Sequence, residues 1–244
     1  MLAKALFLSM ALVAPAAASP PPNSFRLVLN LPSYRLELWD GDEQIKTYQV
    51  TIGMPGHATP TGGFAVTRIE WNPWWTPPDS KWAAGKARTP PGATNPMGRA
   101  KLQFDELLYV HGSSNAKQIG GPHSHGCVRL KNADVLDLAR TIALRSGMLS
   151  ESDIAALERN SKRTRSIELP APVSLFVRYA LTEEIDGELI TLDDPYGWGN
   201  MDGKHVVHTV PVQAVPATEF RTTTADPGGP TIEPASTTDA AATP

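Results

Sequence analysis

The chain is organised around residues 111–130, which read HGSSNAKQIGGPHSHGCVRL. This stretch contains the only cysteine of the 244-residue chain, three of its six histidines and four glycines. The apolar run 107–110 precedes it, and a pattern with helical spacing follows it. A short loop that is dense in reactive side chains and held at both ends by regular structure is typical of a catalytic centre rather than a linker. We therefore interpret Cys127 as a nucleophile and His111 as its base.

Two histidines near Cys127 have different predicted roles. A thiol reacts as the thiolate, and a cysteine with the ordinary pKa of about 8.5 is mostly protonated at neutral pH, so an imidazole must accept its proton. His125 is two residues from Cys127, and on an extended backbone its side chain would leave on the same side as the thiol. His111 ends a predicted strand, which fixes its ring independently of the nucleophile. We expect His111 to be the general acid/base and His125 to shape the site or contact substrate.

The remaining polar groups of the loop suit the stabilisation of a negative charge. Gly126 has no side chain, so a substrate carbonyl can approach the backbone, and the amides of Gly126 and Cys127 can form an oxyanion hole. Arg129 can bind a carboxylate bidentately or hold the loop in place, and we favour the second role. His123 has no assigned role.

The N-terminus predicts export. Residues 1–19 combine Lys4, a short apolar run and the small residues Ala16–Ala18, which is typical of a cleaved signal peptide. Pro15 interrupts the run before the roughly 20 apolar residues of a membrane span, although a retained anchor is the alternative. In an oxidising compartment an unpaired cysteine is explained better by reactivity than by structure. The formal net charge of −3 and the lack of a basic stripe predict no nucleic-acid partner.

The first third of the chain predicts a run of short antiparallel strands. Apolar and polar residues alternate over 25–30 and 34–39, and further strands are expected at 45–52 and 64–69. This pattern predicts a mainly β sandwich or barrel-like fold. Residues 71–97 lose the pattern but hold four tryptophans among prolines. We expect them either to complete the core at the sheet edge or to form a lid or wall beside the catalytic loop.

The second half adds helices and then strands. Asn132 is expected to cap a helix over 133–146, and residues 150–153 to open a second helix with a capping box. Strands are predicted at 173–179, at 188–192 as its partner, and around 205–208. These expectations divide the chain into a core domain at 24–131, a helical segment with packing strands at 132–215, and a disordered tail at 216–244.

Several motifs of the chain resemble those of a known family. His111-Gly112 followed by Ser124-His125-Gly126-Cys127-Val128-Arg129-Leu130 resembles the signature of the L,D-transpeptidase (YkuD-type) catalytic domain. Gly53 with 59–64 and the turn 95–98 are similar to upstream parts of that family, and 193–197 more weakly. The clear similarity runs from about residue 25 to 130. His123 departs from the pattern, where an apolar or small residue is expected.

The resemblance implies a mainly β transpeptidase fold with one or two helices after the active-site loop. It implies a periplasmic or envelope enzyme that needs no cofactor and attacks the bond between meso-diaminopimelate and D-alanine in peptidoglycan stem peptides. Cys127 then carries the acyl group to an amine of another stem or of a wall-anchored lipoprotein, with His111 as general acid/base. Ser124, His125, Gly126 and Arg129 belong to the same matched motif.

Other functions compete with this one. Hydrolysis by an L,D-carboxypeptidase would use the same acyl-enzyme. A zinc-binding protein could use His111, His123, His125 and Cys127, although alternating ligands would be crowded. A sortase-like enzyme shares the order His, Cys, Arg but not the Ser-His-Gly-Cys run, and a non-catalytic wall-binding module would leave the thiol unexplained.

Overall fold

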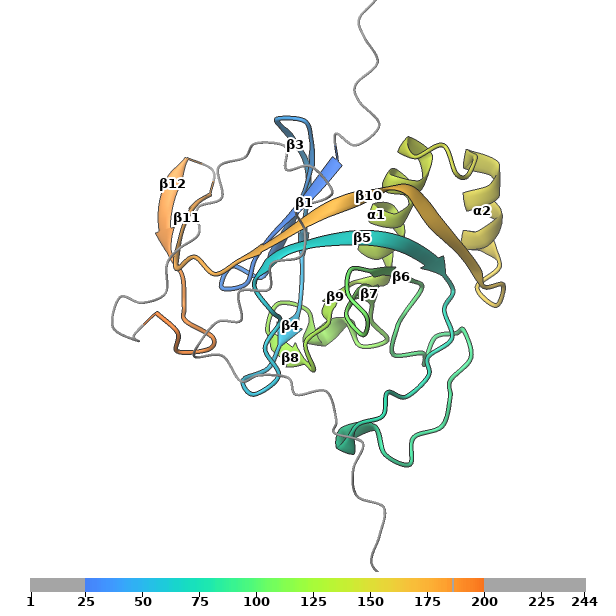
Figure 1. The fold of residues 1–244 in the computed structure, drawn as a ribbon, viewed down its shortest axis with the longest axis horizontal. Coiled ribbons are helices and arrows are strands. Elements are labelled where there is room, and N and C mark those ends of the chain that lie inside the picture. The colour runs from blue at the N-terminus through green and yellow to red at the C-terminus, as the bar shows by residue number, and fades with distance from the viewer. Residues whose placement is uncertain (1–24, 186, 200–244) are drawn as a thin grey trace, which may run out of the picture.

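The fold, taken from a computed structural model that describes residues 25–185 and 187–199, is a strongly curved sheet with helices on one side (Figure 1). The sheet has eight strands in the order β3-β2-β1-β10-β5-β6-β7-β9. In chain order these strands are β1 Phe25–Asn30, β2 Arg35–Asp40, β3 Glu43–Gln49, β5 Gly62–Trp71, β6 Ala100–Gln103, β7 Tyr109–Gly112, β9 Val128–Leu130 and β10 Arg165–Arg178. The predicted mainly β, barrel-like fold is confirmed.

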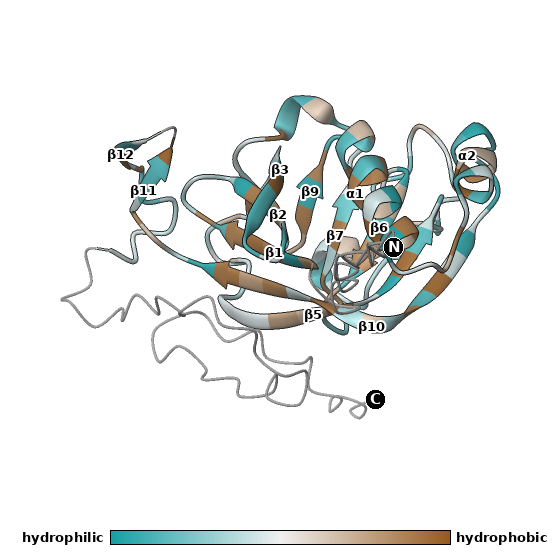
Figure 2. Ribbon diagram, turned by 90° about the horizontal axis from the view of Figure 1, so that it is seen from above, coloured by the Kyte–Doolittle hydropathy of each residue, from teal (hydrophilic) through white to brown (hydrophobic). Residues whose placement is uncertain are grey.

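Strands β1, β2 and β3 form the antiparallel meander that the alternating pattern predicts. Along β1 and β2, every second side chain is buried, including Leu27, Leu29, Leu36 and Leu38. Because successive side chains of a strand point to opposite faces, this alternation places one face of the meander in the core. Figure 2 shows hydrophobic residues on these strands, on β9 and on the helix α1, Asn132–Arg145.

The predicted strand over 45–52 is wrong in its extent. β3 ends at Gln49, and a separate short strand β4, Ile52–Gly53, pairs in parallel with β8, Pro122–Ser124. The chain leaves the meander after Val50, because Val50 still bonds beside β2 whereas Thr51 bonds to β9. The Val50 N–H donates to the Tyr34 carbonyl, and Thr51 exchanges two backbone hydrogen bonds with Arg129, at 2.8 and 2.9 Å.

These bonds nearly close the sheet into a barrel. Thr51 lies two residues beyond the end of the edge strand β3, and Arg129 lies in β9 at the opposite edge. The two edges therefore meet two residues beyond Cys127. Closure satisfies backbone groups that an open edge would leave unpaired.

The prediction that 188–192 pairs with 173–179 is also wrong. β10 is a 14-residue strand between β1, to which it is parallel, and β5, to which it is antiparallel. Its register shifts between Glu168 and Val173, where Pro170 and Pro172 cannot donate to the ladder. The strand β12, Glu188–Thr191, instead pairs with β11, Thr182–Ile185, in a hairpin that projects from the end of the molecule opposite the helix α2, Glu151–Arg159 (Figure 1).

Both predicted helices exist, but one predicted cap does not. Lys131 is the N-cap of α1, and the Asn132 side chain accepts from the Arg99 N–H at 2.9 Å and donates to the Ser113 carbonyl at 3.1 Å. The Asn132 side chain therefore makes tertiary hydrogen bonds instead of the helix-capping bond that asparagine commonly makes. At α2 the predicted capping box between Ser150 and Asp153 is confirmed.

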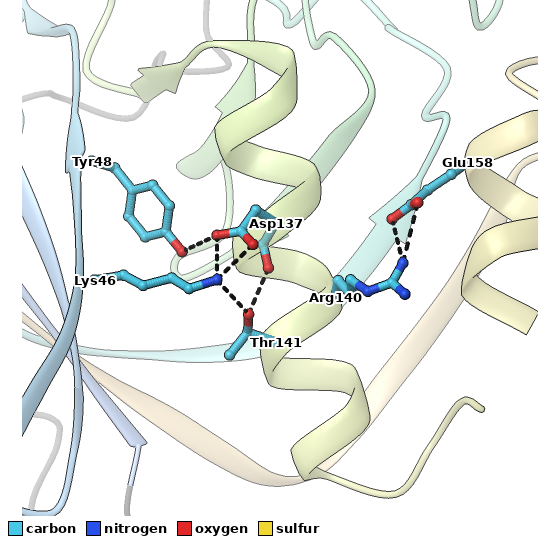
Figure 3. Close-up of polar contacts among 6 residues, drawn as sticks. All are labelled: Lys46, Tyr48, Asp137, Arg140, Thr141 and Glu158. Carbon is cyan, nitrogen blue, oxygen red and sulfur yellow. Dashed lines mark hydrogen bonds and ion pairs between the residues drawn. The ribbon is translucent and has the colours of Figure 1, made fainter. Parts of the chain in front are cut away.

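Ion pairs fix the helices to the sheet and to each other (Figure 3). Lys46 of β3 lies 2.6 Å from Asp137 of α1, and the Tyr48 hydroxyl donates to the same carboxylate at 2.8 Å. Arg140 joins α1 to Glu158 of α2 at 3.3 Å. These contacts join α1 to the edge strand β3 on one side and to α2 on the other.

Three sequence predictions lie outside the described residues: the signal peptide, the strand around 205–208 and the C-terminal tail. Among the helices that the structure describes, none is both long and apolar enough to cross a membrane.

Candidate active site

The predicted nucleophile lies in a tight turn between β8 and β9. Gly126 has a φ of +100°, a conformation that side chains with a Cβ rarely adopt. The buried Ser124 hydroxyl accepts from the Gly126 N–H at 3.1 Å and donates to the Cys127 carbonyl at 2.5 Å. The backbone around Cys127 is therefore fixed by one serine, and the extended backbone assumed for His125 and Cys127 is wrong because the chain turns at Gly126.

The Cys127 thiol is half-buried and neutral at rest. It donates to the Leu107 carbonyl at 3.8 Å. Burial raises the pKa of the thiol, and this effect is opposed by a hydrogen bond from the Tyr109 backbone and by the charge of Arg129. The site therefore holds a thiol that must lose its proton to a base during the reaction.

His111 lies in β7, which runs parallel to β9 with Val110 opposite Val128 and His111 opposite Arg129. The predicted buried strand over 107–110 starts later than expected, at Tyr109, since the Leu108 carbonyl closes a turn with Phe104, and Leu107 is 66% exposed. His111 is thus inside the strand rather than beyond its end. The strand pairing brings it next to the segment that carries Cys127.

The His111 ring is buried and neutral. Its Nδ1 lies 2.5 Å from the Gly112 carbonyl, and since a carbonyl only accepts, Nδ1 carries the proton and Nε2 keeps the lone pair. Burial, followed by the charges of Arg129 and Lys101, lowers the pKa of His111 to about 3, despite carbonyl contacts that favour protonation. Among the described residues the thiol bonds to Leu107 and not to an imidazole, and the shifts of both pKa values favour the uncharged forms.

Arg129 contacts the rest of the site through both its backbone and its side chain. Its backbone closes the barrel through Thr51, while its guanidinium is close enough to Cys127 to lower the pKa of the thiol. Nη1 reaches the His123 carbonyl at 3.4 Å, and the buried Nε has no hydrogen-bond partner among the described residues. A substrate carboxylate would satisfy this cation.

His125 belongs to an aromatic wall that we define as His57, Trp82 and His125. The His125 ring stacks on Trp82 with centroids 4.2 Å apart and contacts His57 at 4.9 Å. Lys86 lies over the Trp82 ring, 4.9 Å from its centroid. Burial, and then the neighbouring His57, lowers the pKa of His125. Trp82 comes from the loop 72–99, which therefore forms a wall beside the catalytic turn.

Two buried asparagines fold this loop. The Asn72 amide donates to the carbonyls of Leu157, Asn160 and Arg163 at 3.0–3.1 Å. The Asn95 amide donates to three carbonyls of the loop itself, those of Pro73, Thr89 and Pro90. The tryptophans do not share one role: Trp71 ends β5 in the core, whereas Trp74 is exposed.

Sequence reasoning gave no role to Thr59 and Tyr196. The buried Thr59 hydroxyl accepts from the Gly53 N–H and donates to the Gly126 carbonyl, both at 2.9 Å. The Tyr196 hydroxyl donates to the Gly53 carbonyl at 2.7 Å. The only signal for these contacts was the similarity of 59–64 and 193–197 to the L,D-transpeptidase family.

The four candidate metal ligands do not form one site. His111 is buried, His123 is exposed with its ring against Gly121, and His125 is stacked in the aromatic wall. Across residues 25–185 and 187–199, no group of three or more histidine, cysteine or acidic side chains has the arrangement of a metal site. The cluster is therefore better described as a thiol with separate imidazoles.

Comparisons with known proteins identify the family of the chain. The model of the YkuD L,D-transpeptidase catalytic domain matches residues 24–162. The putative L,D-transpeptidase YkuD of Bacillus licheniformis is 27% identical over 132 residues, which cover 54% of this chain and 68% of the relative. The probable L,D-transpeptidase YbiS of Escherichia coli K12 is 31% identical over 159 residues, 61% of this chain and 51% of the relative.

One solved structure with a related description is L,D-transpeptidase 3 from Mycobacterium tuberculosis in complex with a faropenem-derived adduct. It has 16% sequence identity and a TM-score of 0.40, and the match covers 63% of this chain and 60% of that one. The chain thus spans about half to two thirds of the length of these relatives. Because the family model covers more than half of the sequence and includes the whole catalytic loop, the chain belongs to the L,D-transpeptidase catalytic domain family.

Proposed function

We propose that the protein is an exported cysteine L,D-transpeptidase that acts on peptidoglycan stem peptides. The observation that carries the proposal is the arrangement at Cys127: a single thiol in a locked turn, beside a buried neutral imidazole on the neighbouring strand. A family whose members act on peptidoglycan supports the substrate class. No metal or organic cofactor is needed for this chemistry.

In the first half-reaction the thiol proton moves to Nε2 of His111, and the sulfur attacks the carbonyl carbon between meso-diaminopimelate and the terminal D-alanine. The carbonyl oxygen then carries the negative charge of a tetrahedral intermediate. When the intermediate collapses, the carbon–nitrogen bond breaks and the leaving amine takes the proton from Nε2. The product is a thioester on Cys127 and free D-alanine.

The second half-reaction reverses these proton movements. An acceptor amine attacks the thioester, His111 removes its proton, and the thiol leaves protonated. The acceptor is an amine of a second stem, which gives a 3–3 cross-link, or of a wall-anchored lipoprotein. Water in place of the amine would give an L,D-carboxypeptidase, which is an outcome of the test below.

The neighbours of Cys127 have proposed roles in the same steps. Ser124 holds the turn, the half-buried Arg129 binds a carboxylate of the stem, and His125 with Trp82 forms the wall against which the stem lies. Gly126 allows the turn, but its N–H already donates to Ser124, so we assign the oxyanion to the Cys127 N–H instead. Residues 1–19 are proposed as the signal that sends the enzyme to the periplasm or envelope.

The test is product analysis by mass spectrometry with purified muropeptides that carry tetrapeptide stems. The wild-type protein should release D-alanine and form dimers joined through diaminopimelate. Cys127→Ala and His111→Asn should each abolish both products, while Thr141→Val, which removes a hydroxyl of α1 that contacts Asp137 and Lys46, should not. Release of D-alanine without dimers would identify a carboxypeptidase, and turnover unchanged in Cys127→Ala would refute the thiol mechanism.

A further inference from the structure

The peptide group between Gly126 and Cys127 is bound by a residue that is distant in sequence. Thr59 donates its hydroxyl proton to the Gly126 carbonyl at 2.9 Å, and both residues are buried. In a planar trans peptide group the C=O and the N–H point in opposite directions. A contact that fixes the Gly126 carbonyl therefore also fixes the direction of the Cys127 N–H.

The Thr59 hydroxyl is itself fixed on its other side. It accepts from the Gly53 N–H at 2.9 Å, so its proton is available only for the Gly126 carbonyl. The Tyr196 hydroxyl donates to the Gly53 carbonyl at 2.7 Å and accepts from the Thr59 N–H at 3.4 Å. One tyrosine thus ties both ends of the turn that presents Thr59.

Tyr196 is anchored in turn by a compact aromatic cluster. Its ring stacks with Tyr179 at 5.7 Å and contacts Trp198 at 4.6 Å. The Asp194 carboxylate accepts from the backbone N–H of Tyr196 at 3.3 Å and of Trp198 at 3.1 Å. This cluster lies beyond residue 162, where the family match ends.

Two other backbone groups of the catalytic turn are already occupied. The Gly126 N–H donates to Ser124, and the Cys127 carbonyl accepts from Ser124. Since Thr59 binds the Gly126 carbonyl, the Cys127 N–H is the backbone group of these two residues that is left for the substrate. An oxyanion donor acts only when it is already aimed at the charge that develops, because reorientation would cost part of the stabilisation.

We propose that Thr59 and Tyr196 are positioning residues that aim the Cys127 N–H at the oxyanion of the acyl-transfer intermediate. The inference rests on the proposed function, because it presumes acyl transfer to Cys127. A positioning role differs from a general contribution of Thr59 and Tyr196 to stability. It predicts slower reactions where an oxyanion forms, and no effect on other reactions of the Cys127 thiol.

Two probes of Cys127 separate these possibilities. In acylation by the carbapenem imipenem, a sulfur–carbon bond forms at the β-lactam carbonyl, an oxyanion develops, and the carbon–nitrogen bond then breaks with protonation of the nitrogen. In alkylation by iodoacetamide, the sulfur displaces iodide from a methylene carbon, and no oxyanion develops. Both rates are measured on the full chain at one pH by intact-protein mass spectrometry.

Thr59→Val should lower the rate of acylation at least tenfold and leave alkylation within threefold, because removal of an oxyanion donor typically costs about 100- to 1,000-fold. Thr59→Ser keeps the hydroxyl and should restore acylation to within threefold of wild type. Thr141→Val, a matched substitution on α1, should leave both rates unchanged. Equal losses in both reactions, or no loss in either, would overturn the proposal.

Thr59→Val leaves two buried backbone groups unpaired, so Tyr196→Phe provides a milder variant. It keeps the stacked ring and removes only the hydroxyl, and acylation alone should fall about three- to tenfold. An unchanged ratio of the two rates in Tyr196→Phe would also overturn the proposal. If the wild-type protein itself is not acylated, the proposed function fails rather than the positioning role.

Discussion

The buried His111 predicts a specific dependence of stability on pH. In the folded protein its pKa is lowered to about 3, first by burial and then by Arg129 and Lys101. In the unfolded chain the imidazole has an ordinary pKa of about 6.5. The unfolded state therefore binds a proton that the folded state does not, so this contribution is fully present above about pH 6.5 and is lost as the pH falls toward 3.

The size of the effect follows from these two pKa values. Between pH 7 and pH 5, protonation of His111 in the unfolded state lowers the free energy of unfolding by about 2 kcal/mol. His111→Asn removes the titration, and its side-chain amide can still donate to the Gly112 carbonyl. The stability of the variant should therefore fall by about 2 kcal/mol less than that of the wild type over the same interval.

The assay is urea unfolding followed by tryptophan fluorescence at a series of pH values. All other ionisable groups are the same in both proteins, so the difference between the two curves isolates His111. Any constant loss of stability in the variant shifts its curve without changing the slope. Parallel curves for wild type and His111→Asn would refute the reasoning, because His111 would then titrate alike in the folded and unfolded states.

Three further outcomes are expected. The rate of Cys127 alkylation by iodoacetamide should rise with pH and reach its midpoint above about pH 8.5, since burial raises the thiol pKa. A midpoint below about pH 7 would instead indicate a thiolate–imidazolium pair. Trp82→Ala should raise KM for tetrapeptide muropeptides about fivefold with a smaller change in kcat, because it removes the ring stacked on His125. Trp74→Ala, which changes an exposed tryptophan of the same loop, is the control. Equal effects of the two substitutions on KM would contradict the role of the aromatic wall in substrate binding. Asn72→Ala should lower the free energy of unfolding, measured in urea, by about 3 kcal/mol, because three carbonyls lose their donor and the φ of +47° at this position disfavours alanine. A loss below about 1 kcal/mol would contradict the role of Asn72 in holding the loop.

The parts of the fold that local sequence predicts are those held by local contacts. Alternation identified β1 and β2, and the capping box identified the start of α2. The position of β10 between β1 and β5 has no local signal, because its pairing with β1 joins Arg26 to Ser174 across most of the chain. Such pairings depend on the whole sheet rather than on any short pattern.

The candidate site divides in the same way. Cys127 and His111 could be inferred because the groups that define their chemistry lie in one motif. Thr59 and Tyr196 could not, because they act through backbone groups 67 and 143 residues away in sequence. Asn132 illustrates the opposite error, since a side chain with a strong local preference for capping bonds to Arg99 and Ser113 instead.

The central position of β10 has a consequence for how the protein is made. Residues 165–178 leave the ribosome after every other strand of the eight-stranded sheet, yet they must enter between β1 and β5. A nascent chain that ends near residue 162 already contains the complete catalytic motif but only two fragments of sheet, each with an unpaired edge. The eight-stranded sheet can therefore be completed only after nearly the whole domain has been synthesised, so the barrel closes late in the production of the chain.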